Sequence, residues 1–380
     1  MKSEFDLFPV RAVQNSVVRA FKREFTPISA IQPAAPIEFA IPGVPNLYLD
    51  LAISELYVRV KIVRSDGANL ANTDLFGTIN LTLHSMFSNV EVELGSKVIS
   101  DPNGLYAYRS YLETLLTYSP EVQNTYMQKE LWYKDTAGEM AVFHTTGNNA
   151  TNNGLLKRAR YFAGGAEVEM MGRPHCDIFH QGRAILSNVP LRLKFIPSKD
   201  KFVIVTPAPA AAQVEYQIKI IECRLYLHSL EVTHSLALAH EQMLHKSNMN
   251  YPIRRVTMKH LSIPANHLSV LHDNIYLGAV PERIVVGLVS DSSLNGGYQE
   301  NPFNFQHFGL NYLALYVNGE LIPSKPYQPN FAEHRYIREY NSLVEGMGLL
   351  YTDQTLPISR EEYEGGYTLY VFDLTPDQNL

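Results

Sequence analysis

Residues 90–99 read Val-Glu-Val-Glu-Leu-Gly-Ser-Lys-Val-Ile, and residues 313–322 read Leu-Ala-Leu-Tyr-Val-Asn-Gly-Glu-Leu-Ile. In both stretches an alternating apolar run leads to a two-residue turn signal, Gly95-Ser96 or Asn318-Gly319, and a short apolar return follows. Alternation on both sides of such a pair is typical of a tight β-hairpin. The pattern therefore predicts two hairpins of the same design in one chain of 380 residues.

The sequences around the two hairpins also correspond. His84 precedes the first hairpin at the distance at which His307 precedes the second, and a short helical pattern follows each hairpin. Upstream, one strand-like segment ends in Val63-Arg64-Ser65-Asp66 and another ends in Leu288-Val289-Ser290-Asp291. The same order of strand, turn, hairpin and short helix in both places indicates two diverged copies of one β-rich domain.

The repeat and the turn signals predict four consecutive parts. An N-terminal arm over residues 1–35 mixes apolar and basic residues and precedes a first jelly-roll over residues 36–230. Within that domain, the irregular and polar stretch 119–165 is expected to be a long surface loop. A helical linker over residues 231–250 leads to a second jelly-roll over residues 251–380. The predicted fold class is all-β, a double jelly-roll of two eight-stranded β-sandwiches in tandem with short helices.

The second copy is predicted to lack its last strands. Its first strands are expected at 253–263 and 269–277, but it has no counterparts of the first copy's strands at 189–195 and 216–230. An unfinished sheet exposes both its edge and its core, which sequences normally avoid. We therefore expect the second sandwich to be completed either by further chain or by another polypeptide.

Composition and charge exclude several classes of protein. Hydrophobic residues make up 46% of the chain and charged residues 18%, which is an ordinary globular balance. The formal net charge of −6 argues against general binding to nucleic acid, and no direct sequence-specific nucleic-acid contact is predicted. Cys176 and Cys223 are too few for a disulfide framework and are predicted to be free, buried thiols. The N-terminus has no apolar run of signal-peptide length, so we expect synthesis and assembly inside the host cell.

Two segments contain metal-ligand residue types, but neither predicts a site. His240 and His245 are five residues apart in the predicted linker helix, about 140° round its axis, so they cannot share a metal ion as residues four apart can. The segment His175-Cys176-Asp177 and the nearby His180 have no second ligand cluster in the sequence, and a zinc site would need more ligands. We expect these four residues to be buried strand residues.

The remaining polar clusters have structural explanations. A cupin-type metal centre would need a His-x-His pair, which the sequence does not contain, and His84 and His307 are expected to be hydrogen-bonded structural histidines. Ser359-Arg360-Glu361-Glu362 fits a capping box that opens a short helix, which accounts for the acidic cluster at 361–364. The sequence thus predicts no catalytic, cofactor-binding or metal-binding residue, no cofactor and no enzymatic activity.

Several longer motifs together resemble one protein family. They are Leu47-Tyr48-Leu49-Asp50-Leu51-Ala52, Leu131-Trp132-Tyr133-Lys134-Asp135-Thr136-Ala137-Gly138, Asn301-Pro302-Phe303-Asn304-Phe305, Leu313-Ala314-Leu315-Tyr316-Val317-Asn318-Gly319, Ile358-Ser359-Arg360-Glu361-Glu362-Tyr363 and Asp373-Leu374-Thr375-Pro376-Asp377. In this order they resemble the major capsid protein, or hexon, of Maverick/Polinton elements and the related adintoviruses. The resemblance extends from residue 47 to residue 377, which is nearly the whole chain.

The resemblance implies a structural role in a virion. It implies a double jelly-roll protomer that forms a homotrimer, a pseudo-hexagonal capsomer and then an icosahedral shell, with penton and minor capsid proteins as further partners. It leaves contact with a membrane open. Family members continue beyond the Asp-Leu-Thr-Pro-Asp motif with strands that close the second sandwich, so the resemblance also implies that those strands are missing before Leu380.

A rival hypothesis is a jelly-roll carbohydrate-binding protein or glycoside-active enzyme. Such a protein needs a concave cleft with exposed aromatic rings, and catalysis needs two carboxylates about 5 to 10 Å apart. The chain has 23 Tyr and 17 Phe that could serve as sugar platforms, but a single Trp argues against this function.

Overall fold

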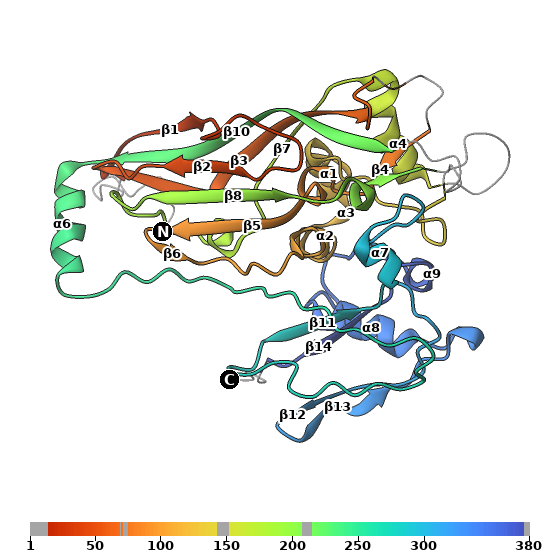
Figure 1. Cartoon of the computed structure of the whole chain (residues 1–380). Coiled ribbons are helices and arrows are strands. Elements are labelled where there is room, and N and C mark those ends of the chain that lie inside the picture. The colour runs from red at the N-terminus through yellow and green to blue at the C-terminus, as the bar shows by residue number, and fades with distance from the viewer. Residues whose placement is uncertain (1–13, 69, 71–74, 143–151, 207–214, 376–380) are drawn as a thin grey trace, which may run out of the picture.

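The structure is a computed structural model, and it describes residues 14–68, 70, 75–142, 152–206 and 215–375. A larger N-terminal part and a smaller C-terminal part are both built from strands and short helices, and α6 lies in the connection between them (Figure 1). The strands are β1 (Val17–Phe25), β2 (Ile37–Ile41), β3 (Leu47–Arg64), β4 (Gly77–Thr78), β5 (Phe87–Leu94), β6 (Lys97–Val98), β7 (Val168–Gly172), β8 (Leu191–Pro197), β9 (Ile204–Val205), β10 (Tyr216–Val232), β11 (Arg283–Gly287), β12 (Leu313–Val317), β13 (Glu320–Tyr327) and β14 (Leu369–Asp373). The helices are α1 (Thr82–Ser85), α2 (Tyr106–Thr117), α3 (Pro120–Asn124), η2 (Tyr126–Glu130), α4 (Asn153–Phe162), η3 (Ala163–Gly165), η4 (Asp177–His180), α5 (Asp200–Val203), α6 (His234–Leu244), α7 (Asp291–Asn295), η6 (Phe331–Glu333), α8 (Ile337–Gly346) and α9 (Arg360–Glu364).

The N-terminal part is a sandwich of two four-stranded antiparallel sheets. One sheet has the strand order β1-β10-β3-β7 and the other has the order β2-β8-β5-β6. Alternation in the sequence produces the buried faces: on β2, Ile37, Phe39 and Ile41 are buried, whereas Glu38 and Ala40 between them are exposed. Eight strands in two such sheets form a jelly-roll, so the predicted fold of the first copy is confirmed.

Both predicted hairpins are confirmed. Strands β5 and β6 pair across a turn at Gly95, whose φ is 66°, and β12 and β13 pair across Asn318 and Gly319, whose φ angles are 51° and 91°. Asn and Gly are the residues that adopt this left-handed backbone most readily. A helix follows each hairpin, α2 after the first and α8 after the second, so hairpin and helix follow one another in the same order in both copies.

The C-terminal part is a smaller β-rich unit. Its described strands form two antiparallel pairs, β11 with β14 and β12 with β13. Tyr327, Tyr370 and Phe372 are buried between these pairs, and α8 packs against β14. Together with the first sandwich this unit gives the chain the architecture of a double jelly-roll. Its second half has fewer described strands than its first, and the expectation that its last strands are missing stays a prediction.

The connection between the two parts differs from the prediction. The helix expected within residues 231–250 is confirmed as α6, but residues 245–282 contribute to no strand, so the strands predicted at 253–263 and 269–277 are wrong. The chain instead runs back from α6 along the first sandwich towards β11 (Figure 1). The segment lies beside the first hairpin, where Arg255 donates to the backbone oxygen of Ile99, but it forms no strand there. Alternation alone does not make a strand.

Two other segments contribute more to the first sandwich than the sequence predicted. β1 lies within the predicted arm 1–35 and pairs along β10, because the arm's apolar and basic residues alternate like those of a strand. The predicted surface loop 119–165 contains α3, η2 and α4, and Trp132 and Phe162 within it are buried. The sequence analysis missed these buried apolar residues because the stretch is polar on average. Most of its polar run, at 143–151, lies outside the described residues.

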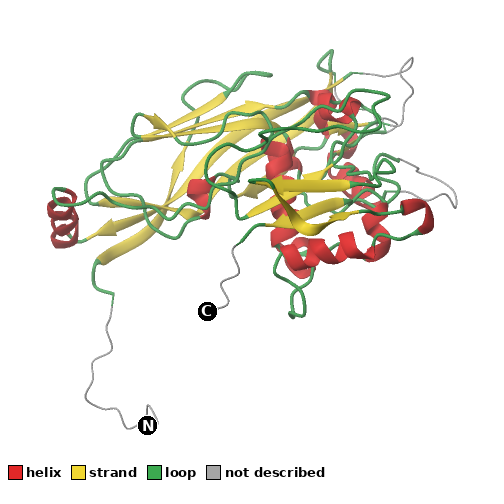
Figure 2. Ribbon diagram, turned by 90° about the horizontal axis from the view of Figure 1, so that it is seen from below, coloured by secondary structure: helices red, strands yellow, loops and turns green. Residues whose placement is uncertain are grey.

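The helices are distributed unevenly over the molecule. Figure 2 shows most of them gathered at the end where the C-terminal part lies, with α6 standing alone at the opposite end. In the described ranges, none of the helices has the combination of length and apolar character that crossing a bilayer requires.

Candidate functional site

The two β-rich parts meet at a buried ion pair. Nη2 of Arg158 lies 2.5 Å from Oδ1 of Asp135, and both side chains are 0% exposed. Arg158 also donates to the backbone oxygen of Thr78 at 2.6 Å, within the first sandwich. Asp135 accepts a hydrogen bond from Nδ2 of Asn301 at 3.2 Å, and Asn301 belongs to the second copy. A charged pair without solvent is tolerated only where further hydrogen bonds satisfy it, so this network fixes how the parts fit together.

Aromatic rings surround this junction. The ring of Phe303 from the second copy stacks on Tyr111 of α2, with ring centroids 4.0 Å apart and an angle of 7° between the planes. The hydroxyl of Tyr367 donates to the backbone oxygen of Asp135 at 2.6 Å. One continuous apolar core therefore extends through both parts, which form the two lobes of the protomer.

A second junction fastens the returning segment to α2. The guanidinium of Arg109 donates to Asp177 at 2.5 Å, to Glu113 at 3.0 Å and to the backbone oxygen of Val256 at 3.2 Å. Burial disfavours the charged form of Arg109, but the two carboxylates outweigh burial and raise its pKa. Asp177 also accepts from the backbone N–H of Val256 at 3.3 Å, so the backbone N–H and the backbone oxygen of Val256 are both hydrogen-bonded.

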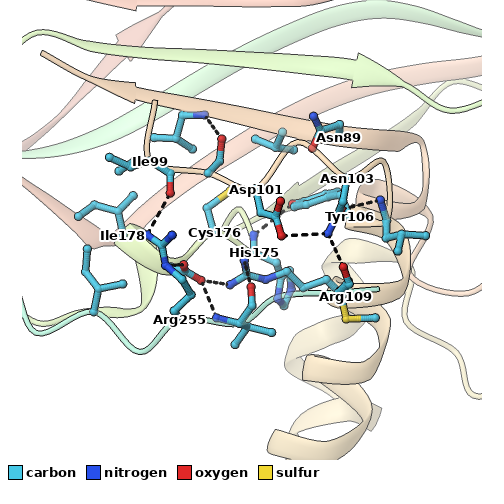
Figure 3. A pocket seen from close by; sticks show the side chains of 18 residues that line it. Asn89, Ile99, Asp101, Asn103, Tyr106, Arg109, His175, Cys176, Ile178 and Arg255 are labelled. Carbon is cyan, nitrogen blue, oxygen red and sulfur yellow. Dashed lines mark hydrogen bonds and ion pairs between the residues drawn. The ribbon is translucent and has the colours of Figure 1, made fainter. Parts of the chain in front are cut away.

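A small cavity lies at this second junction. Figure 3 shows Asp101, Asn103, Arg109 and Arg255 around it, between the first hairpin, α2 and the returning segment. Its volume is about 30 Å³, which suits roughly one water molecule and no sugar or drug-sized ligand.

A larger hollow is open to solvent. It has a volume of about 480 Å³, and its described lining contains one carboxylate and no aromatic ring. The lining residues are Ile31, Lys61, Glu167, Lys219, Ile220 and Ile221. The open hollow lacks the second carboxylate and the rings that a glycoside-active site needs, and the small cavity, although Asp101 and Asp177 line it, is too small for a sugar.

Beside the small cavity, His175 lies at the centre of a cluster of histidines and carboxylates. Its Nδ1 is 2.7 Å from Oε2 of Glu113, and its ring centroid is 4.6 Å from that of His84 and 5.6 Å from that of His180. Nε2 of His84 is 3.2 Å from Oε2 of Glu130. This is the densest grouping of ligand-type side chains among the described residues.

Burial and charge shift the pKa values in this cluster. Burial alone would raise the pKa of Glu113, but the hydrogen bond from His175 and the charge of Arg109 outweigh it and hold the pKa at about 2. Burial lowers the pKa of His180 to about 3, because desolvation disfavours the imidazolium. Burial likewise lowers the pKa of His84.

The fold thus brings together residues that the sequence analysis kept apart. His175 and His180 follow strand β7 instead of lying in a strand, and their partners Glu113, Glu130 and His84 come from three other helices. The sequence separations of 62 residues between His175 and Glu113 and of 46 between His84 and Glu130 left no local spacing pattern to recognise. The repeated position of His84 was the one signal that the sequence carried.

The other histidines and the cysteines have separate environments. Nδ1 of His240 is 2.7 Å from the hydroxyl of Tyr48, whereas His245 is exposed, so these two do not form a pair. His307 stacks on Phe331 with ring centroids 4.1 Å apart. Cys176 and Cys223 are free and buried, and burial raises the pKa of both thiols.

The acidic cluster at 361–364 has the predicted capping role. The Ser359 hydroxyl accepts from the backbone N–H of Glu362, and the Glu362 carboxylate accepts from the backbone N–H of Ser359. Lys134 donates to Glu362 at 2.5 Å, and His334 lies 3.0 Å from Glu364. These carboxylates therefore hold α9 and its neighbours in place.

Comparison with known proteins places the fold. The chain matches no protein-family model. It is similar to an uncharacterised protein of Caenorhabditis elegans, with 23% identity over 367 residues that cover 93% of this chain and 84% of the worm protein. A chain in the cryo-EM structure of the Sputnik virophage superposes with a TM-score of 0.60 at 12% identity, over 99% of this chain and 79% of that chain. The mavirus major capsid protein gives a TM-score of 0.31 at 11% identity, over 76% of this chain and 53% of that chain.

The tandem β-rich parts and the Sputnik superposition define the class of fold: this chain is a double jelly-roll, and it shares this fold with a chain of the Sputnik virophage. This is the fold that the sequence resemblance to the Maverick/Polinton type implies.

Proposed function

We propose that this chain is a major capsid protein that forms homotrimers, which act as pseudo-hexagonal capsomers of an icosahedral shell. The observation that carries the proposal is the tandem of two β-rich parts locked by the Asp135–Arg158 network. Three copies of a two-lobed protomer present six similar flanks, so one trimer can fill a six-fold lattice position.

The surface of the returning segment supports assembly. In residues 259–280 the side chains of Leu268, Leu271 and Leu277 are 103%, 81% and 79% exposed. Apolar side chains gathered in this way mark surfaces that another polypeptide covers. The proposal therefore places protein contacts, and not chemistry, at the centre of this molecule's function.

The proposal includes a location and partners. In this role the protein acts in the virion, and penton and minor capsid proteins contact the outer flanks of its trimers. The small junction cavity and the ring-free open hollow support a structural protein over an enzyme, because neither offers a site for a sugar substrate.

Analytical ultracentrifugation and electron microscopy of the purified protein test this function. We expect a homotrimer that buries well above about 2,000 Å² at its interfaces and has a hexagonal outline in projection. A stable monomer at high protein concentration would contradict the proposal. Binding on a glycan array, or release of sugar in a hydrolase screen, would favour the carbohydrate hypothesis instead.

A further inference from the structure

The inner half of the histidine cluster has the composition of a metal site. His84 on α1, Glu130 at the end of η2 and His175 after β7 each offer one ligand atom, and the three atoms lie within 4.8 Å of one another. The side chains of His84 and Glu130 are only 1% and 4% exposed, and His175 is also buried. Two imidazoles and one carboxylate are a common protein ligand set of zinc.

Neighbouring groups orient both imidazoles for this purpose. Nδ1 of His175 is 2.7 Å from the carboxylate of Glu113, and Nδ1 of His84 is 2.9 Å from the hydroxyl of Tyr106. When each Nδ1 carries the proton and donates a hydrogen bond to these oxygens, both Nε2 atoms keep a free lone pair. A carboxylate behind a histidine is the usual second layer of a zinc centre, where it fixes the ring and raises its basicity.

The charge of the cluster also favours a cation. Glu130 is buried, and within the described chain its ion-pair partner closer than 4 Å is His84. A buried carboxylate without a cation is costly, and a divalent ion between the three side chains would remove that cost.

We propose that His84, Glu130 and His175 bind a zinc ion that ties three separate segments of the first sandwich together. In a tetrahedral zinc site with bonds of about 2.1 Å, neighbouring ligand atoms are about 3.4 Å apart. The observed 3.2 Å between Nε2 of His84 and Oε2 of Glu130 is close to that separation. Imidazole ligands favour zinc over magnesium or calcium, and water supplies the fourth ligand.

The outer half of the cluster is less suited to metal. Nη2 of Arg173 lies 3.2 Å from Nδ1 of His180, and because a guanidinium can only donate, that nitrogen accepts and Nε2 carries the proton. A protonated Nε2 has no lone pair for a metal ion. His180 is therefore excluded from the ligand set, although Glu113, His175 and His180 also lie close together.

Metal analysis of the purified full-length chain tests the site. After dialysis against zinc and then against metal-free buffer, we expect about one zinc ion per chain by mass spectrometry. Cobalt should replace zinc and give the visible absorption bands of a tetrahedral site. His84→Gln and Glu130→Gln should each lose the bound zinc, whereas His180→Gln should retain it. His307→Gln, at the corresponding position of the second copy, is the matched control and should also retain it.

The wild-type measurements decide the matter even where a variant does not fold. Less than about a tenth of an equivalent of zinc, together with no cobalt absorption, would overturn the proposal and leave the cluster as a hydrogen-bonded network. Loss of zinc in His180→Gln with retention in His84→Gln would also overturn the assigned ligands. These measurements do not depend on trimer or shell formation, so the metal site and the capsid function can fail separately.

Discussion

The ion pair between Asp135 and Arg158 is the residue-level feature on which the two-lobed protomer depends. Asp135 accepts from Arg158, Asn152 and Asn301, so its carboxylate is satisfied without water. Replacing a complete buried pair with apolar residues is often tolerated, whereas removing one partner leaves an unpaired buried charge. The stability of the junction should therefore be very sensitive to single substitutions.

We expect Arg158→Ala to lower the free energy of unfolding by about 3–5 kcal/mol, because the Asp135 carboxylate loses its cation in a dry environment. Urea unfolding followed by tryptophan fluorescence measures this change, since the single tryptophan, Trp132, is buried close to the pair in sequence. Arg335→Ala is the control: its partner Glu333 is 2.8 Å away, but the two side chains are 76% and 52% exposed. The control should cost about 1 kcal/mol or less, and equal losses would contradict the assigned role.

A second residue-level prediction concerns acid sensitivity at Glu362. Burial would raise its pKa, but hydrogen bonds from Lys134 and from the backbone N–H of Ser359 outweigh burial and lower it. Burial also lowers the pKa of Lys134 in spite of Glu362. The pKa shift of Glu362 therefore indicates a stabilising ion pair, whereas that of Lys134 does not. The pKa shift of Glu362 decides how stability changes in acid. Lys134 stays protonated there, so the cost of burying its charge does not change with pH.

A carboxyl whose pKa is lower in the folded than in the unfolded state stabilises the fold above the unfolded pKa, and this contribution disappears as the pH falls through the folded pKa. Wild-type stability should therefore decline below the ordinary glutamate value of 4.5. Glu362→Gln should decline less steeply in thermal unfolding between about pH 6 and about pH 3.5. The exposed neighbour Glu361→Gln should follow the wild type, and a Glu362→Gln profile with the wild-type slope would count against this explanation.

At the scale of elements, the turn of the second hairpin can be tested by one substitution. Gly319 has a φ of 91°, which costs an L-residue about 1–2 kcal/mol, so Gly319→Ala should lower the free energy of unfolding by about that amount. Gly182→Ala is the matched control, because its φ lies outside the left-handed region and its added Cβ would meet nothing within 4 Å. Chemical unfolding measures the free energy of unfolding of both variants. Equal values would show that a side chain at the position of Gly319 does not strain the turn.

The elements also show what the sequence could and could not predict. The hairpins, α2 and α6 were predictable because turn residues and periodicity are local signals. The strands expected at 253–263 and 269–277 did not form, because a strand also requires a partner that local alternation cannot reveal. The buried helices within 119–165 were missed because a long polar average hid a few large apolar residues.

The histidine cluster was unpredictable for a similar reason. Its members lie on separate helices and on the loop between β7 and η4, and the fold of the first sandwich brings them together. A metal-ligand search in a sequence depends on short spacings, and the 46 residues between His84 and Glu130 are not one of them. The family resemblance indicated the fold but carried no information on this cluster.

For the whole molecule, the exposed apolar side chains of residues 259–280 form the surface that the proposed assembly would cover. Leucines as exposed as Leu268 and Leu271 contribute nothing to the core of their own protomer. Their conversion to polar residues should therefore leave the fold intact. In a trimer that covers this segment, however, the same change would place charges in an apolar interface.

We expect the double variant Leu268→Asp/Leu271→Asp to keep the wild-type unfolding temperature within about 2 °C when both are measured as monomers, and to sediment as a monomer where the wild type sediments as a trimer. The control Leu268→Met/Leu271→Met preserves the apolar area and should remain trimeric. If the aspartate variant still forms trimers, the segment lies outside the trimer interface. If the aspartate variant unfolds, the two leucines belong to an apolar core within one copy of the chain. They would then not form an interface between copies.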